Sequence, residues 1–338
     1  MIGKNLMNKE EIVSPLFSIV IPNYKRVVPL IKAINSVREQ KSYNELVDKI
    51  IVVDDKSDNI EEIDNSIKEL QDDKIIHLKN NFKSNAAYTR NQGAQAATTD
   101  WICFLDSDDC FTTDKFVNIY NAIKLNGKDI KVYCNKAIVY FDGEVEDVVP
   151  HRFLKDNENI SDYLFVCDEY MQTSTLTIHK SFFDQEGFNE KYIRHQDYDL
   201  CLTLYENGYK IQFLDFVGTS INWGISERPT DKGESVDYSK KWIEENRRRV
   251  SDIAFDNFLF KFVSMKALRS GMKVKALKYL HLVNLKNISY KKLIYFMVLF
   301  FMPKATYTGL YKLFKKRKVN EYKKKNQSIR VVDRKNNQ

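Results

Sequence analysis

The 338-residue sequence predicts an α/β fold, with a doubly wound, mainly parallel sheet and helices on both faces, followed by a helical, basic C-terminal extension. Short apolar runs alternate with amphipathic stretches over the first hundred residues. Hydrophobic residues make up 43% of the chain, enough for a sizeable core, which excludes a disordered or fibrous protein. Basic residues gather near the C-terminus. We therefore expect a leader over 1–16, an α/β domain over 17–250 and a helical C-terminal region over 251–338.

Four runs have the pattern of strands buried on both faces of a parallel sheet, because they are short, nearly continuous and rich in β-branched or aromatic side chains. They cover residues 17–21, 50–53, 75–77 and 101–105. Their spacing leaves room for a crossover helix after each strand. The helices expected there carry the apolar faces Leu30, Ile31, Ile34 and Val37, then Ile60, Ile63, Ile67 and Leu70, with a third helix over about 86–97.

Ligands of such sheets bind beyond the carboxyl ends of the strands. The residues at those ends are polar and acidic: Asn23-Tyr24-Lys25 after the first strand, Asp54-Asp55 after the second and DSDD over 106–109 after the fourth. The first turn has no glycine, so the GxGxxG dinucleotide fingerprint is absent. GxxxxGK[ST], HExxH and GxSxG are absent from the sequence too, which argues against the enzyme classes that depend on them.

Asp106 and Asp108 flank a single residue where the fourth strand ends, so both carboxylates can face one pocket. Hard oxygen ligands in small number suit Mg²⁺ or Mn²⁺, which shares its other positions with water and substrate phosphates. Such a metal can neutralise a diphosphate leaving group. The alternative is a solvated acidic turn or a helix N-cap. Acidic clusters at successive strand ends favour the cation site, because unpaired carboxylates repel one another.

Three further residues have a functional and a structural interpretation. Asp55 can accept hydrogen bonds from a nucleobase imide or a ribose hydroxyl, or it belongs to an Asx-turn. Arg90 can reach a phosphate with two hydrogen bonds, or it pairs with a surface carboxylate. Asp197 begins a helix and is a candidate general base for an acceptor hydroxyl, or an ordinary first-turn acid favoured by the helix dipole.

Together these segments resemble a family 2 glycosyltransferase with the GT-A fold, of the kind that assembles bacterial surface polysaccharides. The resemblance covers about 17–205, through FSIVIPNYKR, IVVDDKSD, NAAYTRNQG, FLDSDD, GFNE and QDYDL in the expected order. It implies a GT-A domain within 17–250 and inverting transfer of one sugar from a nucleotide-diphosphate sugar, with Mn²⁺ or Mg²⁺ as cofactor.

The resemblance also implies roles for individual residues. The implied nucleotide-sugar-binding residues are Asn23, Tyr24, Asp55, Arg90 and Asp106. Asp108 would ligate the metal, and Asp197 would be the catalytic base for a single in-line displacement. The family usually has Glu immediately before that base, where this chain has Gln196, and a neutral amide cannot share proton duty. No QxxRW segment is present, which argues against a processive polymer synthase.

The C-terminal region has a charge of its own. Residues 255–338 carry 21 Lys and Arg against 3 Asp and Glu, whereas the rest of the chain is net acidic. The uncharged run 293–302 is shorter than the roughly 20 residues that span a bilayer. An apolar segment with polybasic flanks favours binding to an anionic membrane surface. The alternative is a buried helix followed by a solvated basic tail. Nucleic acid is disfavoured as a partner, because the segment is hydrophobic before it is basic.

We expect a peripheral protein on the cytoplasmic face of the cell membrane. The five cysteines are odd in number and form no CxxC pair, and no signal peptide is evident. The expected acceptor is a saccharide, in particular a lipid-linked one used in surface polysaccharide biosynthesis. Two alternatives are a metal-dependent nucleotidyltransferase and a non-catalytic, membrane-bound partner that retains the fold. The four candidate acids Asp55, Asp106, Asp108 and Asp197 argue against the second.

Overall fold

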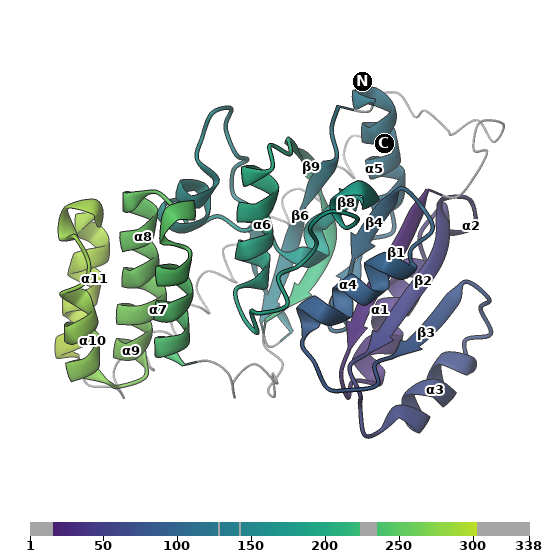
Figure 1. The fold of residues 1–338 in the computed structure, drawn as a ribbon, viewed down its shortest axis with the longest axis horizontal. Helices are drawn as coiled ribbons and strands as arrows, with labels where there is room; N and C mark the ends of the chain where they lie inside the picture. The colour runs from purple at the N-terminus through teal and green to yellow at the C-terminus, as the bar shows by residue number, and fades with distance from the viewer. Residues whose placement is uncertain (1–15, 128, 142, 224–234, 303–338) are drawn as a thin grey trace, which may run out of the picture. The chain divides into compact units, whose positions relative to one another are not determined.

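The computed structural model describes residues 16–127, 129–141, 143–223 and 235–302, and the chain divides into two compact units (Figure 1). The first unit comprises Met1–Ala137 and Met171–Ile221, and the second comprises Ile138–Tyr170 and Asn222–Gln338. α7 (Val236–Glu245), which we expected in the main domain, groups with the C-terminal helices. The functional limits 17–250 and 251–338 stay predictions. Apart from Leu16, the predicted leader lies outside the described residues.

The four predicted strands form a parallel group in the first unit. They are β1 (Phe17–Asn23), β2 (Val47–Asp54), β3 (Ile75–Lys79) and β4 (Trp101–Phe104), in the spatial order β3-β2-β1-β4. All three pairings within this group are parallel. The predicted α/β fold with its parallel sheet is thus confirmed, and the carboxyl ends of β1, β2 and β4 lie at one edge.

The sheet continues with strands that the sequence analysis did not predict. Beyond β4 the order is β8 (Leu176–His179), β6 (Val132–Phe141), β9 (Ile211–Asn222) and β5 (Cys110–Phe111). The pairs β4–β8, β8–β6 and β5–β9 are antiparallel. The parallel group therefore makes up only the N-terminal half of the sheet.

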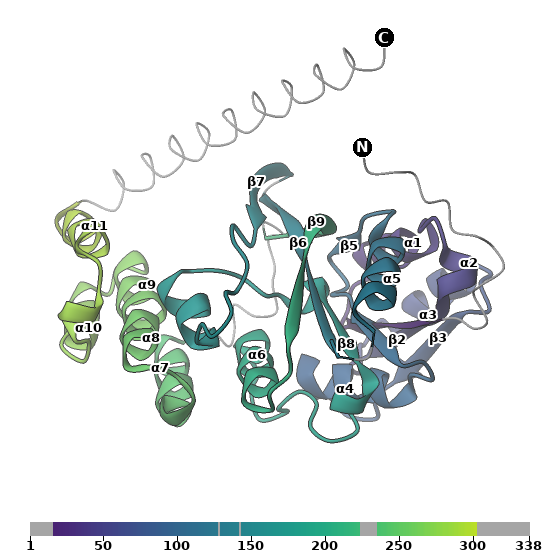
Figure 2. The same ribbon diagram turned by 90° about the horizontal axis from the view of Figure 1, so that it is seen from above.

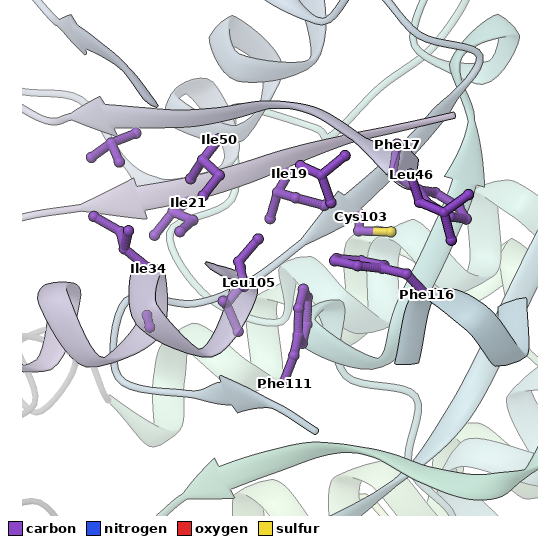
Figure 3. Close-up of a cluster of buried hydrophobic side chains, with 14 of the residues drawn as sticks. Phe17, Ile19, Ile21, Ile34, Leu46, Ile50, Cys103, Leu105, Phe111 and Phe116 are labelled. Carbon is purple, nitrogen blue, oxygen red and sulfur yellow. The ribbon is translucent and has the colours of Figure 1, made fainter. Parts of the chain in front are cut away.

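Helices cover both faces of the parallel group, as predicted. α1 (Val28–Arg38), α3 (Ile60–Lys68) and α5 (Lys115–Asn126) contribute to one buried cluster, and α4 (Ala86–Ala96) packs on the opposite face (Figure 2). Alternation along β1 explains this, since successive side chains of a strand point to opposite faces. Ile19 and Ile21 join the cluster shown in Figure 3, whereas Val20 lies against Gly93 of α4.

The first unit has further helical elements. They are α2 (Tyr43–Leu46), the 3₁₀ turns Thr173–Thr175 and Lys180–Phe182, and α6 (Gln196–Glu206). We call the first of these turns, Thr173–Thr175, the hydroxyl turn, because all three of its residues carry a hydroxyl. All five cysteines of the chain are described, and all are free thiols.

The second unit is mainly helical. Besides α7 it contains β7 (Glu144–Val149), α8 (Asp252–Phe258), α9 (Met265–Arg269), α10 (Lys273–Leu280) and α11 (Tyr290–Phe301), with π-helical turns at Asp162–Val166 and Leu259–Ser264 and 3₁₀ turns at Arg247–Arg249 and Leu285–Asn287. Aromatic rings of Phe165, Trp242 and Phe258 pack together in its core. Within the described ranges, every helix is too short or too polar to traverse a bilayer. The predicted helical extension is confirmed as far as residue 302.

Candidate functional site

Polar side chains gather at the carboxyl edge of the parallel strands. β1 ends at Asn23, β2 ends at Asp54, and Asp106 follows two residues after β4. The backbone N–H of Asp55 donates to the carbonyl of Asn23 (2.9 Å), which joins the ends of β1 and β2. Asn23 is almost fully buried, and its Oδ1 has no hydrogen-bond partner among the described residues. A buried acceptor without a donor is costly, and a ligand N–H or O–H could satisfy it.

Asp54 and Asp55, the two adjacent acids at the end of β2, make different hydrogen bonds. Asp54 Oδ1 accepts the backbone N–H of Ser57 (2.6 Å), so the local side-chain turn of this segment is made by Asp54 and not by Asp55, for which an Asx-turn was considered. Asp55 instead accepts from Ser84 through both its backbone N–H (2.8 Å) and its hydroxyl (2.5 Å), and it is paired with Lys83. The Lys83 ammonium also lies 3.4 Å from the centre of the Tyr24 ring. Asp55 and Tyr24 therefore both contact Lys83, which lies between them.

Arg90 connects two acidic segments that are far apart in sequence. Its guanidinium donates to Asp106 Oδ1 (2.5 Å) and to Gln196 Oε1 (2.9 Å). Burial lowers the pKa of Arg90, but the carboxylates of Asp106 and Asp197 outweigh that effect and raise it above the ordinary value. The guanidinium is thus engaged by protein groups. Contact with a diphosphate would require it to release one of them.

Asp108 and Asp109 are held by different partners. Arg26, from the loop after β1, pairs with Asp108 Oδ2 at 3.0 Å and donates to the hydroxyl of Ser107 at 3.2 Å. Asp109 is buried, and its Oδ2 accepts the hydroxyl of Ser174 at 2.7 Å. The loop 106–109 is therefore an ordered, partly neutralised segment and not a solvated acidic turn.

Asp197 lies in the first turn of α6 and accepts a hydrogen bond from the hydroxyl of Thr173. Burial raises the pKa of the Asp197 carboxyl, and the nearby Asp106 carboxylate raises it further. The positive charge of Arg90 lowers this pKa. The net shift is upward. A carboxylate with a raised pKa is a stronger base than an ordinary aspartate, which suits proton abstraction from a hydroxyl.

The hydroxyl turn joins the two acidic segments. Ser174 accepts the backbone N–H of Asp106 (3.1 Å) while donating to Asp109, and its neighbour Thr173 donates to Asp197. A hydrogen bond holds the turn in place: the buried ammonium of Lys115 donates to the carbonyl of Ser174 (2.9 Å). Burial lowers the pKa of Lys115 to about 8. Loop 106–109 and the start of α6 are therefore tied to one short segment.

Sequence reasoning missed five residues of this arrangement: Arg26, Lys83, Lys115, Thr173 and Ser174. Arg26 is the last residue of the FSIVIPNYKR motif, so its position close to Asn23 and Tyr24 in the sequence was a usable signal. Nothing in local pattern marks the others. Their contacts join positions 24 to 68 residues apart, and only the folded chain creates them.

A cation fits this site only together with further ligands. Among the described residues, no three His, Cys, Asp or Glu side chains are placed to hold a metal ion. Asp108 contributes hard oxygen atoms, and one of them faces Arg26. Oxygen ligands from a bound diphosphate would complete the coordination that Mg²⁺ or Mn²⁺ requires. The residues present therefore fit a metal bound jointly with such a ligand.

A separate cavity of about 610 Å³ lies away from these acids, near the N-terminal ends of β2 and β3. Its lining includes Arg38, Tyr43, Asp72 and Lys74, and contains none of the candidate site residues. Arg38 and Tyr43 both donate to Asp72 (2.9 Å each), which gives this cluster a structural explanation.

The fold is an α/β sheet with a polar, acidic edge at the carboxyl ends of its parallel strands, and comparisons with known proteins identify the family. Residues 18–193 match the profile of glycosyl transferase family 2. The chain is 34% identical over 236 residues to the amylovoran biosynthesis glycosyltransferase AmsB of Erwinia amylovora, covering 68% of this chain and 76% of that protein. It is 29% identical over 205 residues to the Escherichia coli UDP-Glc:alpha-D-GlcNAc-diphosphoundecaprenol beta-1,3-glucosyltransferase WfaP, covering 60% and 76%.

Solved structures agree on the fold. The crystal structure of S. aureus TarS 1–349 in complex with UDP-GlcNAc aligns with a TM-score of 0.54 at 17% identity, covering 78% of each chain. This chain belongs to glycosyl transferase family 2. The family and the GT-A fold expected from the motifs are confirmed.

Proposed function

We propose that this protein is a metal-dependent, inverting glycosyltransferase that moves a single sugar from a nucleotide-diphosphate sugar to a saccharide acceptor in surface polysaccharide biosynthesis. The observation that carries the proposal is the bridge made by Arg90. It holds Asp106, from the strand-end loop, beside Gln196 and Asp197 at the start of α6. A donor-side acid and a candidate base thus share one site.

On the donor side, the nucleotide would lie over the ends of β1 and β2. Tyr24 offers a ring, Asn23 a buried unpartnered oxygen, and Asp55 a carboxylate for the base or the ribose. Lys83 must leave Asp55 for that contact to form. Asp106 would face the ribose, with Arg90 near the diphosphate.

On the acceptor side, Asp197 would take the proton of the attacking hydroxyl. The freed oxygen forms a bond to the anomeric carbon while the bond from that carbon to the diphosphate oxygen breaks, and the nucleoside diphosphate leaves from the opposite face. One such displacement inverts the anomeric configuration. Gln196 cannot assist as an acid or base because its side chain is a neutral amide; its Oε1 accepts from Arg90 and its Nε2 donates to the carbonyl of Tyr192 (2.6 Å). Asp197 therefore bears the proton transfer alone.

Mn²⁺ or Mg²⁺, bound at Asp108 with the diphosphate, would offset the charge of the leaving group. Arg26 pairs with the same carboxylate and orients it. The donor site would thus form fully only when nucleotide and cation bind together.

The acceptor class follows from relatives. WfaP and a Campylobacter jejuni relative, 27% identical over 199 residues, carry names that specify undecaprenol-linked acceptors. We propose that the acceptor of this chain is also lipid-linked. Its C-terminal region would then lie at the anionic inner face of the cell membrane. The charge of that region, net +18 over 255–338, supports the extension.

The test is thermal unfolding of the full chain with UDP, GDP and ADP and their sugars, each with and without Mn²⁺. Saturating ligand at about 100 times its Kd stabilises the folded state by about 2.7 kcal/mol, a shift of several degrees. We expect such a shift for one nucleotide, enhanced by Mn²⁺. A shift that is identical in chelator would contradict the metal assignment, and no shift for any nucleotide would favour a non-catalytic partner.

Product analysis separates the enzyme classes. With the stabilising sugar nucleotide, a glycosyltransferase releases the nucleoside diphosphate, whereas a nucleotidyltransferase releases pyrophosphate. Asp197→Asn should abolish turnover and keep the nucleotide-induced shift. Glu206→Gln also replaces a carboxylate by its amide, at the other end of α6, and is the matched control.

A further inference from the structure

α11 carries apolar side chains on two opposite faces, and only one of them is covered by the described protein. Phe296 and Leu299 are buried on the inner face, where α11 packs on α9 and the Phe296 ring lies 6.0 Å from that of Phe260. The outer face carries Tyr290, Ile294, Met297, Val298 and Phe301, which are all exposed. These five positions follow the i, i+4, i+7, i+8, i+11 spacing of one helical stripe.

The orientation of α11 about its own axis is fixed by polar contacts. Lys292 pairs with Asp168 (3.0 Å) and donates to Asn257 Oδ1 (3.1 Å), so this lysine belongs to the inner face. Ser289 caps the helix by accepting the backbone N–H of Lys292 (3.4 Å). The outer stripe therefore cannot turn inward without breaking this pair. Phe301 is 73% exposed and Tyr290 68%, which are high values for aromatic residues.

Positive charge surrounds the stripe. Residues 257–302 contain nine Lys and Arg and not one Asp or Glu. Lys291 is exposed in the first turn of α11, and Lys273 of α10 donates to the carbonyl of Phe300 (2.5 Å) in its last turn. The apolar stripe is thus flanked by lysines at both ends. In Figures 1 and 2, α10 and α11 form the outer edge of the helical group in this unit.

We infer that the outer face of α11 inserts into the interfacial region of an anionic lipid bilayer, with its axis parallel to the membrane plane. Twelve residues span about 18 Å, too short to cross the roughly 30 Å hydrocarbon core. An amphipathic helix lying in the interface buries its apolar face several ångströms deep while cationic side chains meet the headgroups. Tyr290 suits the membrane–water interface, because its ring is apolar and its hydroxyl can stay hydrated. This deepens the membrane partner of the proposed function.

Charge complementarity selects the lipid surface over other occupants. A second copy of this chain would bring another stripe flanked only by lysines, and like charges would oppose the contact. The segment 303–338 carries twelve Lys and Arg against two acids, so it would meet the same repulsion. An anionic bilayer offers apolar depth and opposite charge together.

The experiment is sedimentation of the full chain with vesicles of phosphatidylcholine alone or with 30% phosphatidylserine, in low and high salt. The test variant is Ile294→Ser/Phe301→Ser, which changes two exposed side chains and leaves the buried face intact. Leu125→Ser removes an exposed leucine from α5 and is the matched control. Unchanged melting temperatures establish that each variant is folded.

We expect the wild type to prefer anionic vesicles and to retain part of its binding in high salt. The double variant should bind at least about tenfold more weakly, and high salt should release it fully, whereas Leu125→Ser should bind like the wild type. Equal binding of the double variant would assign the membrane contact to the basic tail alone and overturn the inference. A wild type that ignores vesicles, or that forms a dimer dispersed by the double substitution, would overturn it too.

These measurements need neither donor nor acceptor. Their failure leaves the nucleotide shift and product analysis untouched, so the insertion face and the transfer reaction can fail separately.

Discussion

Replacing Ser174 by alanine tests whether the hydroxyl turn positions the acids of the site. The Ser174 hydroxyl donates to the buried carboxylate of Asp109 (2.7 Å) and accepts the backbone N–H of Asp106 (3.1 Å). A hydrogen bond to a charged group is worth about 1.5–3 kcal/mol and a neutral one about 1 kcal/mol. The substitution therefore removes about 2–4 kcal/mol of interaction from the loop that carries Asp106 and Asp108.

Part of this loss will appear as lower stability and part as a misplaced loop. Since 1.4 kcal/mol corresponds to a factor of ten, we expect kcat/KM for the donor to fall at least about tenfold. The assay is release of the nucleoside diphosphate at limiting donor concentration, with urea unfolding measured in parallel. The apparent affinity for Mn²⁺ should weaken as well, because Asp108 lies in the displaced loop.

Ser36→Ala is the matched control. The Ser36 hydroxyl is also buried, accepts a backbone N–H, that of Phe111 (3.0 Å), and donates to the carbonyl of Ala33 (2.7 Å), but it touches none of the candidate acids. Its loss should lower stability and leave kcat/KM near that of the wild type. If Ser174→Ala and Ser36→Ala reduce activity equally, the hydroxyl turn is ordinary core structure and the reasoning fails.

Three other predictions follow from single contacts. Because the pKa of Asp197 is raised and a base works only when ionised, the acid limb of kcat should lie above the ordinary aspartate value of 3.8; a rate that stays flat into that range would contradict the assignment. Gly93→Ala would put a methyl group 2.3 Å from Val20 Cγ1, so the unfolding free energy should drop by about 1–3 kcal/mol; an unchanged urea midpoint would refute this packing. Arg90→Lys cannot serve both acceptors of the guanidinium, and kcat/KM should fall at least about tenfold with little change in melting temperature; wild-type kinetics would exclude the bridge.

Local pattern was sufficient for the N-terminal half of the fold. The runs near 17–21, 50–53, 75–77 and 101–105 are strands, and the helix expected over about 86–97 is α4. β1, β2 and β4 are mainly buried on both faces, so their apolar continuity is visible in the sequence itself, whereas β3, expected to be buried in the same way, is a half-buried edge strand. The antiparallel half escaped prediction for two reasons. β5 has only two residues, too few to display a period, and β6 and β9, although 10 and 12 residues long, mix polar and apolar side chains without strict alternation or a continuous apolar run.

Motif order singled out the candidate acids, but not the groups that contact them. Asp55 and Tyr24 do share a partner, Lys83, yet nothing in the sequence places a lysine there. Arg90 was expected beside a diphosphate, and its present partners, Asp106 and Gln196, lie 16 and 106 residues away. Sequence spacing carries no information on such contacts, because they depend on how the strands order themselves in the sheet.

For the C-terminal region too, the sequence determines some properties and the tertiary contacts determine others. Composition alone determined that 293–302 is apolar, too short to span a bilayer and surrounded by basic residues. It could not show which side of a helix at 293–302 is buried, because this run is apolar on every side and has no polar face to set the orientation. The pair formed by Lys292 and Asp168 and the packing of Phe296 decided that, burying one stripe and leaving the other exposed. The sequence determines how much apolar surface a segment such as 293–302 can bury. Only the tertiary contacts determine which face is buried, because both faces are apolar and the hydrophobic effect does not distinguish between them.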